Sequence, residues 1–286
     1  MSATARMLPD GRLHLNHGPI DVVLRAWGDG GEVKRAYMQA AAAFRSILPG
    51  LCRELPLLRR PLPGPRPEGF VARRMHAAAT PFADRFITPM AAVAGAVADH
   101  LLAAMRDGRR LARAFVNDGG DIALHLEPDQ SFRCGIVTDL MAPGLDAVAT
   151  IRAEDGIGGI ATSGRAAKGE GGRSFSLGIA DAVTVLAADA ATADAAATLI
   201  ANAVDLPGHP AVVRVPAVSL DPDSDLGDRP VTVGLGALKP IEIRYALAAG
   251  VAEAERFRSR GLIRAAILHL AGARAVCGPA PVAIAA

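Results

Sequence analysis

An acid and a hydroxyl, Asp194 and Thr198, stand four residues apart in an alanine-rich segment that we expect to form a helix over Ala190–Ala203. Side chains at positions i and i+4 of a helix share a face, so the carboxylate and the hydroxyl can reach one point. Hard oxygen ligands of this kind suit Mg²⁺, which keeps water or phosphate oxygens in its other positions. The structural alternative is that Asp194 stands in the first turn because the helix macrodipole favours an acid there, and that Thr198 is simply small enough to pack.

Two glycine-containing loops could hold an anionic or planar ligand through backbone N–H groups, because they carry little side-chain bulk. Their residues are Asn117, Gly119, Gly120 and Asp121 in one loop, and Thr162, Ser163 and Gly164 in the other. Neighbouring segments supply the further candidate binding residues Thr88, Met90, Ser174, Ser176 and Asp181. The competing explanations are a plain hairpin turn for the glycine pair, core packing for Met90, and backbone capping for the two serines.

The sequence does not match three common nucleotide-binding and catalytic motifs. The stretch Gly156–Ala161 fits a dinucleotide fingerprint in its letters, but it runs into more glycines where that motif must open a helix. A P-loop requires Gly-Lys-Ser/Thr, whereas the chain has Lys168-Gly169-Glu170. Ser163 lacks the flanking glycines of a hydrolase nucleophile elbow, and the histidines show no paired spacing.

The elements that must position these residues alternate between helices and strands. Helical spacing is found over Glu32–Leu48, Val71–Ala79, Met90–Arg106, Ala190–Ala203, Val251–Arg258 and Gly261–Leu270. Strands are predicted over Arg12–Asn16, Ile20–Ala26, Leu111–Asn117, Asp121–Leu126, Arg133–Thr138, Ala147–Ala153, Ala182–Leu186, Val212–Val215, Val231–Leu235 and Ile241–Ala246. We expect a loop over Gly156–Gly172 and a frayed tail over Gly278–Ala286.

Because the strands come as hairpins as often as singly, this pattern predicts an α+β fold, with a mixed, largely antiparallel sheet and packed helices. Each half of the chain carries a small-residue helix, over Ala91–Leu102 and Ala190–Ala203, close to a strand with a glycine turn. An internal duplication is therefore an open alternative.

Composition excludes several classes of partner. The net charge of the 286 residues is +2 and the arginines are scattered, so no basic stripe for nucleic acid is present. The longest apolar run, Ala91–Met105, is interrupted by Asp99 and His100 and falls short of the roughly 20 residues that a spanning helix needs. The N-terminus has no apolar signal region, and the three cysteines lie far apart. We expect a cytoplasmic protein without a membrane partner.

The chemistry-bearing segments together resemble the ApbE-like superfamily, known for FAD:protein FMN transferases. The phrases TPMAAVAGAVAD, NDGGDI, GIATSG, SFSLGIADAVTV and ADAAATLIANAVD cover roughly Thr88–Asp205 in the family's order and spacing. They are most similar to its short prokaryotic branch, catalogued as an uncharacterised protein family (number two-eighty). The resemblance implies one ApbE-like domain over residues 1–286, with two interlocked lobes at about 1–110 and 111–286 as the alternative.

The resemblance also implies ligands. In the transferases an acid and a threonine four residues later bind Mg²⁺, the places that Asp194 and Thr198 occupy, and a backbone carbonyl that would be Val93 here completes the site. The family's Gly-Gly-Asp turn and Thr-Ser-Gly loop shape its flavin pocket. The implied cofactor is Mg²⁺, and the implied ligand is FAD or a related dinucleotide.

Two departures leave the activity open. Ala94 stands where transferases usually carry lysine, and the family's His-x-x-Asp-Pro stretch is missing, with Arg173 where the short branch tends to have histidine. The first hypothesis is a protein that binds a flavin or related dinucleotide through Mg²⁺. If active, it would pass a nucleotidyl or FMN moiety to an acceptor, which is a protein in the transferases. The alternatives are a catalytically silent ligand- or partner-binding protein and a hydrolase of another small molecule. Small-residue surfaces favour close packing of subunits, so a homodimer is a further expectation.

Overall fold

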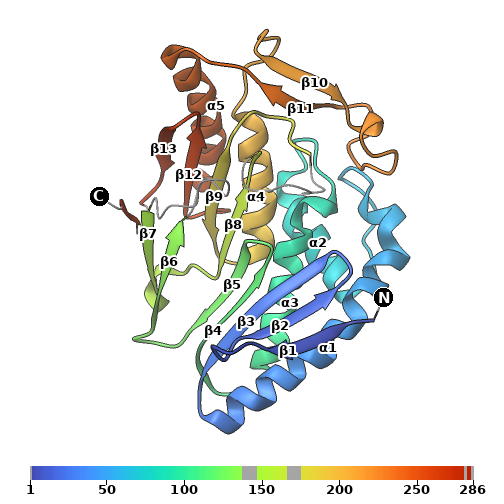
Figure 1. The fold of residues 1–286 in the computed structure, drawn as a ribbon, viewed down its shortest axis with the longest axis vertical. Coiled ribbons are helices and arrows are strands. Elements are labelled where there is room, and N and C mark those ends of the chain that lie inside the picture. Colours follow the sequence, from blue (N-terminus) through green and yellow to red (C-terminus); the bar gives the residue numbers. More distant parts are fainter. Residues whose placement is uncertain (1, 137–146, 166–174, 280–281, 285–286) are drawn as a thin grey trace. The chain divides into compact units, whose positions relative to one another are not determined.

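The computed structural model describes residues 2–136, 147–165, 175–279 and 282–284 (Figure 1). The contacts among its residues divide the chain into two compact units, each built from three separate segments. Unit 1 comprises Met1–Phe132, Ile151–Ala161 and Ala187–Ala195, and unit 2 comprises Arg133–Thr150, Thr162–Leu186 and Ala196–Ala286. Both units combine helices with antiparallel strands, so the predicted α+β class is confirmed.

The sheet of unit 1 is built from consecutive antiparallel hairpins. Its strands follow the order β1 (Thr4–Met7), β2 (Leu13–His17), β3 (Ile20–Gly28), β4 (Leu111–Asp118), β5 (Asp121–Leu126) and the beginning of β8 (Gly159–Ser163). The register Asp118↔Asp121 closes the β4–β5 hairpin on the Gly119-Gly120 turn, as the sequence predicted. Strands β1 and β8 were not predicted.

Helices cover one face of this sheet (Figure 1). They are α1 (Gly30–Leu58), α2 (Phe70–Ala79) and α3 (Val93–Arg106), with the 3₁₀ turns η1 (Thr80–Phe82) and η2 (Pro89–Ala92) before α3. Helix α1 contacts β2 and β3, whereas α3 contacts β4 and β5. The core between them holds fully buried side chains such as Leu15, Leu24, Phe44, Leu101 and Val116.

Helix α1 is longer than predicted. The predicted end at Leu48 is wrong, because the helix passes through Pro49 and Pro56 and ends at Leu58. Its buried residues Phe44, Ile47, Leu51 and Leu58 keep one apolar stripe across the prolines, and burying that stripe outweighs the backbone hydrogen bonds that proline removes.

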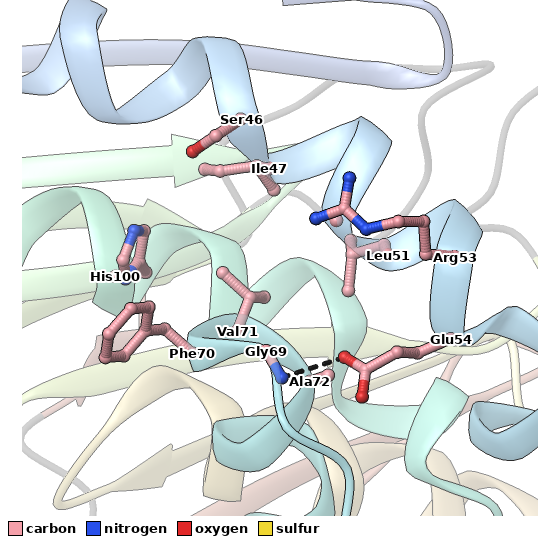
Figure 2. Close-up of a pocket in the computed structure, with 11 residues that line it drawn as sticks. Ser46, Ile47, Leu51, Arg53, Glu54, Gly69, Phe70, Val71, Ala72 and His100 are labelled. Atoms are coloured by element: carbon pink, nitrogen blue, oxygen red, sulfur yellow. Dashed lines mark hydrogen bonds between the residues drawn. The ribbon is translucent and has the colours of Figure 1, made fainter.

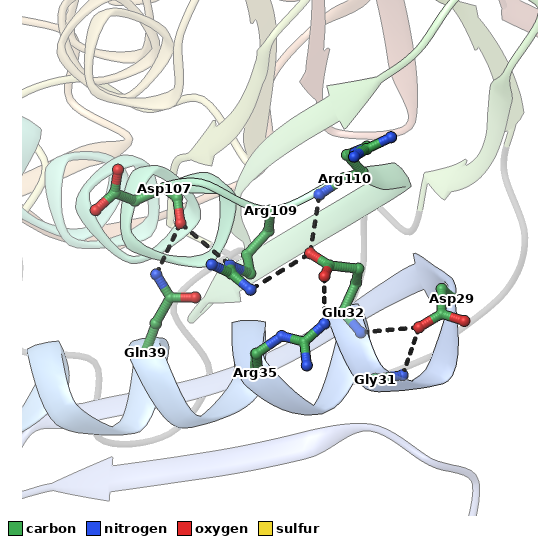
Figure 3. Close-up of polar contacts among 8 residues, drawn as sticks. All are labelled: Asp29, Gly31, Glu32, Arg35, Gln39, Asp107, Arg109 and Arg110. Carbon is green, nitrogen blue, oxygen red and sulfur yellow. Dashed lines mark hydrogen bonds and ion pairs between the residues drawn. The ribbon is translucent and has the colours of Figure 1, made fainter.

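The start of α1 is held by side chains (Figure 3). The Asp29 carboxylate accepts the N–H groups of Gly31 and Glu32, at 2.8 and 3.3 Å. Glu32 in turn pairs with Arg35 and Arg109 and accepts the Arg110 N–H at 3.2 Å. These contacts fix α1 against the loop that leads from α3 into β4.

Unit 2 has three strand groups. Strand β12 (Ala265–Leu270) lies between β9 (Ala182–Ala187) and β13 (Ala273–Cys277), and α5 (Pro240–Ser259) packs on β12 and β13. A separate ribbon pairs β10 (Val212–Pro216) with β11 (Pro230–Leu235), and a third group has the order β14 (Val282–Ile284), β7 (Ala147–Arg152) and β6 (Ser131–Ile136). The remaining elements are α4 (Ala190–Ala203), which begins in unit 1 and ends in unit 2, and the turns η3 (Ala153–Asp155) and η5 (Ala217–Ser219).

Two predictions in this part of the chain are wrong. The strand expected over Ile241–Ala246 is the first part of α5, since Pro240 occupies the first helical turn and the Glu242 carboxylate accepts the Lys239 N–H at 2.7 Å. The helix expected over Gly261–Leu270 is instead strand β12, which is buried along its whole length between two other strands. Complete burial removes the alternation that identifies a strand.

The glycine-rich segment and the tail also differ from expectation. Gly159–Ser163 forms β8 rather than loop, and Val282–Ile284 forms β14, which pairs with β7, rather than fraying. Residues 166 to 172 of the expected loop lie outside the described residues. In the part of the chain that the structure describes, no helix is both long and apolar enough to cross a membrane.

Candidate functional site

The Asp194 carboxylate lies at the start of another helix, α3. Its Oδ2 accepts the backbone N–H of Gly95 at 3.1 Å, and the N–H of Ala94 also donates to this carboxylate. Helix α3 follows Ala92, which supplies no capping side chain of its own. Asp194 therefore satisfies N–H groups in the first turn of α3 that would otherwise lack an acceptor.

A second acid makes the reverse connection. Asp99 in α3 accepts the N–H groups of Ala190 and Ala191, at 3.1 and 3.0 Å, and so caps the start of α4. Asp189 accepts the next N–H, that of Thr192, at 2.8 Å. The first three N–H groups of α4 thus all have carboxylate acceptors, and a phosphate would find none of the three free.

The two helix starts approach so closely that only glycine fits. A Cβ built on Gly95 would lie 2.2 Å from the carbonyl oxygen of Ala190. At the start of strand β8, a Cβ on Gly159 would lie 2.2 Å from the Ala190 nitrogen, and one on the preceding residue, Gly158, would lie 2.3 Å from the Ala188 oxygen. The glycines that imitate a dinucleotide fingerprint therefore make room for the start of α4.

Two further acids act on Asp194. Burial raises the pKa of Asp194 well above its usual range, and the charges of Asp121 and Asp118 raise it further. Asp118 is only 6% exposed, and its pKa rises to about 8 through burial and then through the charges of Asp121 and Asp21. The strongest charges felt by Asp194 are therefore negative, so binding a proton or a cation would relieve the repulsion.

Asp118 was not among the predicted site residues. Its position does carry a signal, because Ala114 and Val116 are buried at alternate positions of β4 and Asp118 continues that buried face. An acid in phase with a buried apolar face is the pattern that would have identified it.

The predicted metal ligands are arranged less completely than expected. Thr198 is half-buried and lies one turn after Asp194 on α4. Val93 is the first residue of α3. Its carbonyl and the N–H of Ala94 belong to the same peptide unit, and that N–H donates to Asp194. Because the two groups of a trans peptide point in opposite directions, the Val93 oxygen is turned away from that carboxylate. No group of three His, Cys, Asp or Glu side chains among the described residues is arranged to hold a metal ion.

The other predicted residues of unit 1 flank this acidic group. The Asn117 Oδ1 accepts the Gly120 N–H at 2.8 Å in the turn that follows. That turn is open, since no described residue lies within 4 Å of a Cβ built on Gly119 or Gly120. Asp121, beside that turn, is partly exposed. Thr88 is buried at the start of η2, whereas Met90 within that turn is half-buried.

The predicted residues of unit 2 form their own set. The Thr162 hydroxyl is hydrogen-bonded to that of Thr184 at 2.9 Å, and Gly164 has a φ of +137° with no room for a Cβ beside the Asp181 backbone. The Asp181 carboxylate accepts the Ala271 N–H at 2.6 Å, which fixes the β12–β13 turn. Ser163 is half-buried, and the hydroxyl of the buried Ser176 has no hydrogen-bond partner among the residues that the structure describes. Ser174 lies outside the described residues.

Comparisons with known proteins identify the family. The family model described as AbpE bacteria matches residues 5–276. The UPF0280 protein of Archaeoglobus fulgidus is 39% identical over 122 residues, which are 41% of this chain and 45% of that protein. That of Methanothrix thermoacetophila is 39% identical over 118 residues, 41% of this chain and 46% of that protein. The chain thus spans less than half the length of these curated relatives.

One solved structure is similar over a longer range. A crystal structure of the ApbE protein from Thermotoga maritima shares 14% sequence identity, covers 96% of both chains and has a TM-score of 0.40. The family model, by contrast, matches nearly the whole of this sequence. On that match, the chain belongs to the ApbE-like family described as AbpE bacteria, to which its UPF0280 relatives point as well.

Proposed function

We propose that this protein binds a flavin or a related dinucleotide together with Mg²⁺, and that Asp194 and Thr198 hold the metal. The observation that carries the proposal is the acidic group in unit 1, where Asp118 and Asp121 raise the pKa of Asp194. A half-buried carboxylate close to two other acids favours a bound cation, and carboxylate and hydroxyl oxygens are ligands that Mg²⁺ accepts.

The donor set fits Mg²⁺ on this proposal. Asp194 offers its carboxylate, which the Ala94 and Gly95 amides orient, and Thr198 adds a hydroxyl one helical turn later. With only these protein donors, most of the octahedral positions would be filled by water and by the phosphates of the ligand, as is usual for this ion. When bound, Mg²⁺ supplies charge neutralisation and polarisation of a pyrophosphate.

The residues of the chain have separate tasks in this proposal. The Ala94 and Gly95 amides fix the orientation of the Asp194 carboxylate, while the open Gly119-Gly120 turn offers backbone close to the acids without side-chain bulk. If the protein is an enzyme, it transfers a nucleotidyl or FMN moiety from the dinucleotide to an acceptor.

A catalytically silent binding protein is the second candidate. Ala94, where the transferases usually carry lysine, has no amine that could act on a phosphate or an acceptor. This candidate keeps the metal and the ligand and lacks the transfer step.

The test is a thermal-shift and absorbance titration with FAD, with and without Mg²⁺, on the wild type and two matched variants. Asp194→Asn removes the charge of the proposed ligand, whereas Asp99→Asn removes that of the reciprocal cap. We expect stabilisation by FAD to require Mg²⁺, to vanish in Asp194→Asn and to persist in Asp99→Asn. No stabilisation of the folded wild type by FAD and Mg²⁺ would refute the proposal, and release of FMN and AMP would separate the enzyme from the silent binder.

A further inference from the structure

A cavity of about 250 Å³ lies in unit 1 between α1, the beginning of α2 and His100 of α3 (Figure 2). None of the residues that line it belongs to the proposed metal or dinucleotide set. An inference drawn from this cavity is therefore independent of the function proposed above.

The middle of the cavity is apolar. Ile47 and Leu51 of α1 face Val71 of α2, and all three side chains are buried against the core (Figure 2). Phe70, at the rim, is 75% exposed, and its ring is covered only in part by the Arg73 guanidinium, 4.9 Å from the ring centre. Such a large exposed aromatic surface beside an apolar hollow indicates room for a ligand that would cover it.

The two ends of the cavity carry nitrogen donors. His100 lies at one end, beside the Phe70 ring, and Arg53 at the other (Figure 2). Arg53 is exposed and forms no ion pair with any residue that the structure describes. An unpaired guanidinium at the end of an apolar hollow favours an anionic group, and a carboxylate matches its fork of N–H donors.

The neighbouring acid, Glu54, is not paired with the Arg53 guanidinium. The Glu54 carboxylate accepts the backbone N–H of Gly69 at 2.9 Å (Figure 2) and that of Glu68 at 2.6 Å, and so holds the entry to α2. Its negative charge remains nearby, however, which disfavours a doubly charged phosphate more than a singly charged carboxylate.

We propose that this cavity binds a small monocarboxylate with an aromatic or branched aliphatic body, which rests on Ile47, Leu51 and Val71 while its carboxylate binds Arg53. The cavity is smaller than the roughly 300–1,000 Å³ of drug-sized sites, so the ligand has on the order of ten non-hydrogen atoms. Phenylacetate and 4-methylpentanoate have this size and chemistry.

Calorimetric and saturation-transfer NMR titrations test the proposal with these two acids, and with 2-phenylethanol as an uncharged control. We expect saturable binding of at least one acid with a Kd of about 1 mM or tighter, and about tenfold weaker binding of the alcohol. No saturation by either acid up to about 10 mM, or equal binding of the alcohol, would overturn the proposal.

Matched variants locate the site. Ser46→Trp fills the cavity from an exposed position of α1, and Ala42→Trp places the same ring on an exposed position of α1 that does not line it. Arg53→Gln removes the guanidinium, and Arg60→Gln removes one outside the cavity. Binding should be lost in Ser46→Trp and weakened about tenfold in Arg53→Gln, with both controls unchanged. Binding that survives Ser46→Trp and Arg53→Gln alike would contradict the assignment.

Discussion

Asp99 and Asp194 each cap the helix on which the other stands. Asp99 of α3 accepts the first N–H groups of α4, and Asp194 of α4 accepts N–H groups of the first turn of α3. Both acids end the same local pattern, Ala-x-Ala-Asp, over residues 96–99 and 191–194. This exchange is the structural counterpart of the likeness between the two small-residue helices, and it ties the proposed metal ligand to the folding of α3.

The Asp99 cap should contribute strongly to stability because both of its acceptor contacts are buried. We expect Asp99→Ala to lower the free energy of unfolding by about 1–3 kcal/mol, since two helix N–H groups lose their acceptor. Urea unfolding followed by circular dichroism measures this loss. Asp99→Asn keeps one acceptor oxygen and should lose less, so equal losses in the two variants would show that a hydrogen bond is not what Asp99 provides.

Hydrophobic periodicity and turn residues were sufficient to predict the elements in which tertiary packing follows the same pattern. The β4–β5 hairpin carries alternation and a glycine turn, and α4 was predicted with its observed bounds. Prediction failed where packing overrides a local signal. The apolar residues that suggested a strand, Ile241 and Tyr245, are exposed on α5, whereas the helix buries a different stripe that includes Leu247 and Phe257.

The candidate site was predictable only in part for a related reason. The spacing of Asp194 and Thr198 is visible in the sequence. The hydrogen bond of Asp194 with Gly95 and its electrostatic interactions with Asp118 and Asp121, however, join residues from α3, β4 and β5. Such contacts depend on how strands and helices meet in space. No periodicity within one segment encodes them.

Gly95 should tolerate no side chain. A methyl group there would lie 2.2 Å from the Ala190 carbonyl oxygen, and backbone at this distance must move. We expect Gly95→Ala to destabilise the protein by about 2–4 kcal/mol or to prevent folding. Gly50→Ala is the matched control, because Gly50 lies within α1 and a Cβ there would make only an ordinary contact with the Arg53 side chain, at 3.9 Å. Alanine at this position should stabilise by about 0.5–1 kcal/mol. Thermal unfolding of both variants checks the contrast, and a stable Gly95→Ala would contradict the close approach.

The proline inside α1 should limit stability. Pro49 is exposed within the helix, where it removes a backbone hydrogen bond that alanine would restore. We expect Pro49→Ala to raise the free energy of unfolding by about 1–2 kcal/mol, less than the full helix cost of proline because the unfolded chain also becomes freer. Urea unfolding measures the change. If α1 ended at Pro49, as the sequence alone suggests, the substitution would have little effect.

Stability should depend on pH through Asp118. Its pKa is raised from 3.8 to about 8, first by burial and then by the charges of Asp121 and Asp21, so the folded state holds a proton that the unfolded state releases. Without metal, the free energy of unfolding of the wild type should therefore fall as the pH rises from about 4 to about 8. The fall should be about 1.4 kcal/mol for each pH unit between the two pKa values. Asp118→Asn cannot titrate and should gain on the wild type by a few kcal/mol across this range.

Urea unfolding in EDTA at several pH values measures that difference, with Asp107→Asn as the control for an exposed carboxylate. A difference between Asp118→Asn and wild type that stays constant from pH 4 to pH 8 would contradict the raised pKa. Adding Mg²⁺ at pH 8 connects this result to the proposed function, because a bound cation replaces the proton as the charge that offsets the acids. The wild type should then recover stability, and Asp194→Asn should recover much less.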